Sequence, residues 1–187
     1  LICNQPSWKK EFQVQDIFDE PYNFGSCNSC KVYSLNPFPN KRQLDQAYDE
    51  SYHGFGEKKF NPLVEKVLDW FRKQNAKQFA KELPEKAKVL DVGCGNGTFL
   101  EYLGKQGDFE LHGIEPIGKS GDRAEKLEGL KVRRGFLEEN TFEKLYFDAI
   151  ILTHVFEHLP NPLKSLKTIS AIAADNAILQ IEIPNVN

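Results

Sequence analysis

The sequence predicts an α/β fold, in which a parallel β-sheet carries helices on both faces. Two observations support this. From Lys88 onward, short apolar segments typical of buried strands alternate with helical patterns. The first of these strands ends in a glycine-rich loop that opens a helix, and a strand–helix–strand succession needs a parallel crossover. The expected strands are 88–92, 110–114, 130–134, 147–152 and 177–183, and the expected helices are about 97–105, 118–127 and 162–173.

The chain before Lys88 has a different character. Residues 1–40 show no helical periodicity and contain several prolines, so we expect a small irregular module there. Residues 41–84 are expected to form a helical linker or lid, whose main helix starts at Asn61–Pro62 and ends before Pro84. The main domain then spans 85–187. An aromatic cluster precedes the helix and is expected to cover a cleft: Tyr48, Tyr52, His53 and Phe55.

Composition narrows the range of partners. The 187 residues carry a net charge of -3, with 40% hydrophobic and 27% charged residues. An acidic balance argues against a nucleic-acid surface, because phosphate binding needs a basic face. The sequence has neither an apolar run of membrane-spanning length nor a signal peptide, so we expect a cytoplasmic protein that acts on a small molecule. Because the sequence stops just after an apparent strand, further C-terminal strands are expected to be missing.

The glycine loop is the most specific signal. Gly93, Gly95 and Gly97 follow the strand at every second position, which lets a ligand approach the backbone where a helix begins. A dinucleotide fingerprint would place its third glycine at Thr98, so an NAD-dependent enzyme is disfavoured. Glu115 ends the next predicted strand, where a carboxylate can accept hydrogen bonds from ribose hydroxyls.

The segment Leu90–Gly97 resembles the first motif of class I S-adenosylmethionine-dependent methyltransferases, which have a Rossmann-like sheet. The resemblance implies that the glycine loop wraps the amino-acid end of the cofactor and that Asp91 orders this loop. It also implies that Glu115 binds the adenosyl ribose and that the loop after the third strand passes the adenine. The expected cofactor-binding residues are Asp91, Gly93, Cys94, Gly95, Gly97, Glu115, Pro116, Phe136, Leu137 and Thr153.

Catalytic candidates follow the fourth predicted strand. His154, Glu157 and His158 are three and four residues apart, so a helical turn would place them on one side, beside the cofactor. A histidine could act as general base, or the three could hold a divalent cation. They could also only support the cofactor loop. The segment is similar to that of ubiquinone-type O-methyltransferases, where acids surround the Glu-His pair, and His154 in place of an acid argues against a hard-cation site.

The N-terminal cysteines indicate a second, structural site. Cys27-x-x-Cys30 has the spacing of a zinc knuckle, and Cys3 is a third candidate ligand. A cysteine immediately before Leu1 would complete the set. This part of the chain is similar to the zinc-binding, zinc-ribbon-like module that precedes sugar C-methyltransferases of deoxysugar pathways.

Together these patterns predict methyl transfer from S-adenosylmethionine to a small acceptor, either a sugar nucleotide or a quinol-like phenol. Glu182 or Asn185, at the end of the fifth strand, could face that acceptor. The alternatives are a non-catalytic protein that binds the cofactor and a zinc-mediated docking module.

Overall fold

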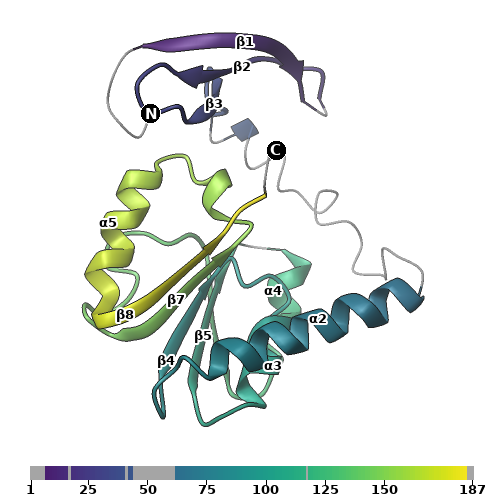
Figure 1. Ribbon diagram of the computed structural model, residues 1–187, viewed down its shortest axis with the longest axis vertical. Helices are drawn as coiled ribbons and strands as arrows, with labels where there is room; N and C mark the ends of the chain where they lie inside the picture. The colour runs from purple at the N-terminus through teal and green to yellow at the C-terminus, as the bar shows by residue number, and fades with distance from the viewer. Residues whose placement is uncertain (1–6, 17, 41, 44–61, 117, 185–187) are drawn as a thin grey trace. The chain divides into compact units, whose positions relative to one another are not determined.

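The structure is a computed structural model that describes residues 7–16, 18–40, 42–43, 62–116 and 118–184. The chain divides into two compact units, residues 1–53 and 54–187 (Figure 1). The aromatic cluster expected over a cleft lies outside the described residues, as do Cys3 and Asn185.

The first unit contains a three-stranded antiparallel sheet in the order β1-β2-β3. Its strands are β1 (Trp8–Gln15), β2 (Pro21–Cys27) and β3 (Tyr33–Asn36). The prediction of an irregular module was wrong here. Phe12 and Val14 share one face of β1 and alternate with polar residues, so a strand pattern was present in the sequence although most of β1 is exposed.

Ring contacts hold this small sheet together. Phe12 and Phe24 have ring centroids 5.0 Å apart on neighbouring strands, and Phe24 stacks on Tyr33 at 5.4 Å. Trp8 covers Gly25, where a Cβ atom would lie 2.5 Å from the indole ring. Cross-strand aromatic pairs therefore supply much of the packing.

The second unit confirms the predicted parallel sheet. Five strands pair in the order β6-β5-β4-β7-β8, and each neighbouring pair is parallel. The strands are β4 (Lys88–Val92), β5 (Glu110–Glu115), β6 (Leu130–Arg134), β7 (Phe147–Thr153) and β8 (Ala173–Glu182). The last strand starts earlier than predicted, directly after the preceding helix.

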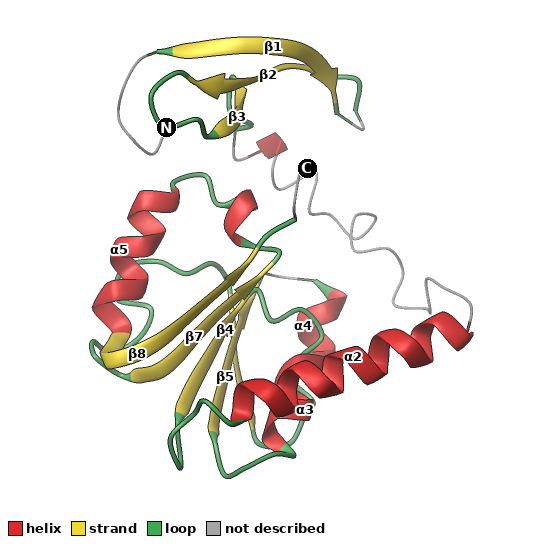
Figure 2. Ribbon diagram, in the orientation of Figure 1, coloured by secondary structure: helices red, strands yellow, loops and turns green. Residues whose placement is uncertain are grey.

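Helices lie on both faces of this sheet, as the sequence predicts (Figure 2). They are α2 (Pro62–Ala80), α3 (Thr98–Gly104), α4 (Lys119–Ala124), the 3-10 turn η1 (Phe156–His158) and α5 (Pro162–Ile172). Helix α4 is shorter than the predicted 118–127. No helix among the described residues has the length and apolar character needed to cross a membrane.

Successive side chains of a strand point to opposite faces of the sheet, so each face has its own hydrophobic core. Val89 of β4 packs with Ala76 and Phe79 of α2, whereas the next residue, Leu90, packs with Ile169 of α5. All of these side chains are buried. A strand with helices on both sides is apolar on both faces, which explains the near-continuous apolar sequence of β4 and β7.

Candidate active site

The glycine loop joins β4 to α3 at the carboxyl edge of the sheet. The backbone N–H groups of Gly93 and Cys94 both donate to the carbonyl oxygen of Ile114 in β5, at 2.8 and 3.2 Å. Gly93, Gly95 and Gly97 all have positive φ angles, of 75°, 55° and 75°. Such angles favour glycine, so the loop needs all three residues to keep its path.

The three glycines face different surroundings. A Cβ atom on Gly93 would lie 2.3 Å from Val155, and one on Gly97 would lie 2.7 Å from Leu127. At Gly95 no atom lies within 4 Å of that position. Gly93 and Gly97 are therefore packed against protein, while Gly95 opens into free space where a ligand can approach the backbone.

Two buried carboxyl groups lie behind the loop. Asp91 is 6% exposed and Glu115 is 5% exposed, and the Oε2 atom of Glu115 accepts a hydrogen bond of 2.9 Å from the N–H of Gly95. Burial, and secondly the nearby Glu115, raise the pKa of Asp91 to about 8. Two adjacent buried acids favour a cationic ligand, because a positive charge would relieve both effects.

Cys94 belongs to the glycine loop, near both acids, and is not activated as a nucleophile. Burial raises the pKa of its thiol to about 12, with further contributions from Asp91 and Glu115. Its side chain fills the space over Gly113 of β5, where a Cβ atom would lie 2.5 Å from the sulfur. Cys94 is therefore a small packing residue.

A cleft of about 870 Å³ opens beside the loop, a volume within the ordinary range for small-molecule sites. One side is formed by the glycine loop and the ends of β7 and β8, and the other by one face of α2. Its lining comprises Leu68, Phe71, Arg72, Asn75, Gln78, Phe79, Glu82, Asp91, Gly93, Cys94, Gly95, Asn96, Thr98, Phe99, Ser120, Thr153, His154, Gln180 and Glu182.

The predicted cofactor residues divide into two groups. Asp91, Gly93, Cys94, Gly95 and Thr153 line the cleft, as does the catalytic candidate His154. The others are absent from its lining: Gly97, Glu115, Pro116, Phe136 and Leu137. The ring of Phe136 is 56% exposed, while Leu137 packs against the core on the α5 side of the sheet.

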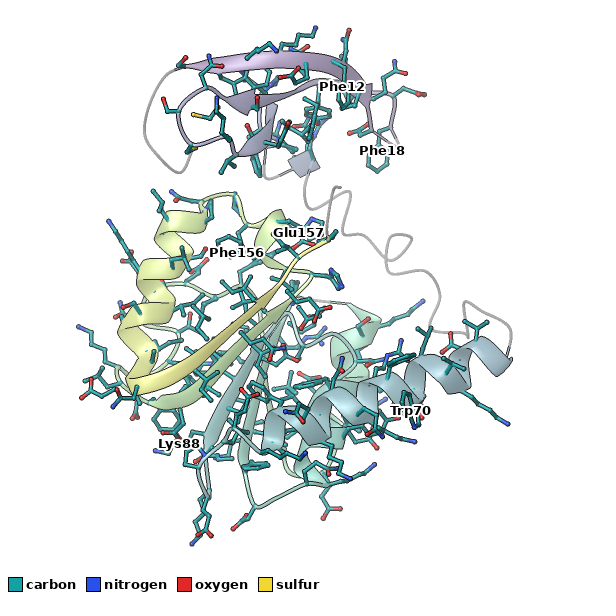
Figure 3. The ribbon with its side chains drawn as sticks, viewed as in Figure 1. Phe12, Phe18, Trp70, Lys88, Phe156 and Glu157 are labelled. Carbon is teal, nitrogen blue, oxygen red and sulfur yellow. The ribbon has the colours of Figure 1, made fainter. Side chains whose placement is uncertain are left out.

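The catalytic candidates lie together at the carboxyl end of β7. The Nδ1 atom of His154 is 3.8 Å from Glu157, and the Nε2 atom of His158 is 3.9 Å from the same carboxylate oxygen. Glu157 and Lys88, both labelled in Figure 3, lie at opposite ends of the sheet. Among the described residues, no group of three or more His, Cys, Asp or Glu side chains is arranged to hold a metal ion.

Glu182 makes a second contact to His154. Its backbone carbonyl accepts a 2.9 Å hydrogen bond from the His154 N–H, and its carboxylate oxygen is 3.6 Å from Nε2. His154 has a positive φ of 55°, an uncommon conformation for a non-glycine residue. The register of β7 with β8, which pairs Thr153 with Glu182, sets this contact.

The sequence predicted a helical linker or lid over 41–84 but named no site residue on α2. Leu68, Phe71, Asn75 and Gln78 of α2, and Glu82 in the turn that follows it, recur at helical spacing along this side of the cleft. The apolar residues of the helix predict a packed stripe, but periodicity does not say that part of the stripe borders a cleft. Ser120 and Gln180 carried no motif that could have identified them.

A five-stranded parallel sheet with a glycine loop and an acid at the next strand tip defines a Rossmann-like α/β domain that binds a small molecule. Residues 64–187 match the family model described as a methyltransferase domain, and the chain belongs to that family. Most of the second unit is thus a methyltransferase domain.

Individual relatives agree with this family. The chain is 35% identical over 133 residues to the ubiquinone biosynthesis O-methyltransferase of Histophilus somni, covering 64% of this chain and 53% of the relative. It is 29% identical over 154 residues to the carboxy-S-adenosyl-L-methionine synthase of Campylobacter hominis, covering 76% and 63%. The chain therefore spans about half of the first relative and less than two thirds of the second.

A solved structure shows the same fold. The crystal structure of a SAM-dependent methyltransferase from Aquifex aeolicus superimposes with a TM-score of 0.53 at 27% sequence identity, covering 66% of this chain and 72% of that one. The predicted parallel α/β fold and the methyltransferase family are confirmed by these comparisons. The predicted zinc module and the individual roles of the site residues stay predictions.

Proposed function

We propose that this protein transfers a methyl group from S-adenosylmethionine to a hydroxyl group of a small molecule, either a quinol-like phenol or a sugar nucleotide. The observation that carries the proposal is the glycine loop, which opens at Gly95 into the cleft beside buried Asp91. The name of the Histophilus relative, an O-methyltransferase of ubiquinone biosynthesis, supports a phenolic acceptor.

The residues of the cleft fit the cofactor. The open space at Gly95 lets the amino-acid end of the cofactor come close to the backbone of the loop. Asp91 offers a carboxylate to a cationic group of the cofactor. Glu115 lies at the tip of β5 but outside the cleft lining, where it holds the loop through the Gly95 N–H, so a contact to the ribose hydroxyls would need its second carboxylate oxygen. When bound, S-adenosylmethionine supplies an electrophilic methyl group.

We assign the general base to His154 rather than His158. His154 lines the cleft and His158 does not. The Glu157 carboxylate lies 3.8 Å from Nδ1 of His154, and the Glu182 carboxylate lies 3.6 Å from Nε2. These negative charges can stabilise the imidazolium that forms when His154 takes a proton. The base removes the hydroxyl proton as the acceptor oxygen attacks, and much of the rate comes from alignment in the cleft.

Titration calorimetry of the whole chain with S-adenosylmethionine and S-adenosylhomocysteine tests the binding half of this proposal. We expect both to bind, and binding of neither would overturn it.

The chemical half is tested by following S-adenosylhomocysteine formation with dihydroxyphenyl compounds and sugar nucleotides as acceptors. We expect His154→Gln to lower kcat by about 10²–10⁴-fold while cofactor affinity is retained, the range for loss of a general base. His158→Gln is the matched control and should retain most activity. If His158→Gln lowers kcat more than His154→Gln does, His158 is the base instead. If the protein binds the cofactor but methylates none of the acceptors, a non-catalytic cofactor-binding protein is favoured.

We also propose that Cys27 and Cys30 contribute two thiolates to a structural zinc site. The two cysteines flank a tight turn, in which the Lys31 N–H donates to the Cys27 carbonyl at 3.0 Å. Cys27 is buried and Cys30 is partly exposed. Elemental analysis of the purified chain should find about one zinc per chain, and Cys27→Ser with Cys30→Ser should remove it. A metal content unchanged by these substitutions would refute the site.

A further inference from the structure

One aromatic side chain that lines the cleft, Phe71, is only half covered by protein. Phe71 lies in the α2 row that lines the cleft, yet it is 53% exposed, whereas Phe79, two turns further along the same row, is 5% exposed. Trp70 contacts it nearly edge-on, with ring centroids 5.0 Å apart (Trp70 is labelled in Figure 3). A phenyl ring left half open inside a concave site suggests that a ligand covers it.

The charged side chains of the cleft favour a cation. The cleft lining carries three carboxyl groups, on Glu82, Asp91 and Glu182. The one guanidinium, on Arg72, has its Nη1 atom 3.9 Å from Glu65, which offsets part of its charge. The cleft thus combines acidic side chains on both of its walls with an exposed aromatic ring on α2.

A sulfonium centre is a cation of a particular kind. It has no N–H or O–H donor, so it cannot form the charge-assisted hydrogen bonds by which carboxylates bind ammonium or guanidinium groups. The negative face of an aromatic ring attracts such a centre electrostatically without a donor. An aromatic side chain in an acidic cleft is therefore well suited to it.

We infer that Phe71 contacts the sulfonium of S-adenosylmethionine and makes the cleft prefer this cofactor over its neutral, demethylated product. The inference rests on the proposed function and adds a residue that distinguishes the charged cofactor from its neutral product. The consequence is functional: a ring that holds the cation and releases the neutral thioether lowers product inhibition.

The test compares Kd values for S-adenosylmethionine and S-adenosylhomocysteine by calorimetry on the full chain. Phe71→Leu keeps the apolar character and removes the π-system. We expect it to weaken S-adenosylmethionine binding by about 2- to 30-fold, the range that cation–π energies imply, and to change S-adenosylhomocysteine binding less than twofold. Phe71→Trp, which keeps an aromatic face, should retain the preference.

Phe12→Leu is the matched control, because Phe12 is equally exposed, at 53%, but belongs to the first unit. It should leave both affinities unchanged. If Phe71→Leu weakens the two ligands equally, or weakens neither, the inference is wrong. If the unaltered protein binds neither ligand, the proposed function fails instead, so the two failures are distinguishable. Retained S-adenosylhomocysteine binding also shows that the variant is folded.

Discussion

The buried carboxyl of Asp91 should make the stability of the ligand-free protein fall as pH rises. Its pKa is about 8 in the folded protein against 3.8 for an ordinary aspartate. Between these values the folded protein holds a proton that the unfolded chain has released. The free energy of unfolding therefore falls by about 1.4 kcal/mol per pH unit across this window.

Asp91→Asn isolates this effect, because asparagine has the same shape and no charge. From pH 5.5 to pH 7.5 we expect the variant to gain roughly 2–3 kcal/mol of stability relative to the unaltered protein. Above about pH 8 the difference should level off, since Asp91 is then ionised in both states.

Urea denaturation followed by far-ultraviolet circular dichroism, at half-unit steps of pH, measures the difference. Asp175→Asn, which alters an exposed carboxylate on β8, serves as the control and should follow the unaltered protein. Parallel pH profiles for Asp91→Asn and the unaltered protein would refute the reasoning, because Asp91 would then ionise as easily when folded as when unfolded.

Three further results are expected. Cofactor binding at pH 7 should release close to one proton, because a bound cation favours the ionised form of Asp91. Calorimetry in buffers of different ionisation enthalpy measures this release, and a binding enthalpy that does not depend on the buffer would contradict it. Gly93→Ala should lower the free energy of unfolding by about 2–4 kcal/mol in urea denaturation, since its Cβ atom would clash with Val155. Gly95→Ala should lower it by only about 1–2 kcal/mol, but should also weaken cofactor binding. Cys94 should resist iodoacetamide at pH 8 until the protein unfolds, as mass mapping can detect; rapid native labelling would mean that its thiol is not buried.

The parallel sheet and the loop at Gly93–Gly97 were predictable because local physics specifies them. A buried strand such as β4 needs consecutive apolar residues, and a loop with three positive φ angles needs glycine. The end of β5 at Glu115 follows from the same strand–helix alternation.

Tertiary contacts determined what the sequence did not reveal. The sequence predicted His154 beside the cofactor, but its contact to Glu182 depends on the register in which β7 and β8 pair, and no local pattern reports that register. The short η1 turn leaves His158 outside the cleft lining although it lies close to the same Glu157 carboxylate. The sheet of the first unit was missed because the alternation of β1 at Phe12–Gln15 is short and stands among the prolines and polar residues of 1–40.

The contact between Cys94 and Gly113 constrains how this domain can change over time. Because the sulfur already occupies the place of a side chain at position 113, alanine there becomes tolerable only after position 94 has shrunk. The order of substitution thus matters: Gly113→Ala alone would clash with the Cys94 sulfur, whereas Gly113→Ala after Cys94→Gly would not. Ancestral reconstructions or mutational libraries of this domain should therefore contain the two changes as a pair, with the smaller residue in the loop arising first.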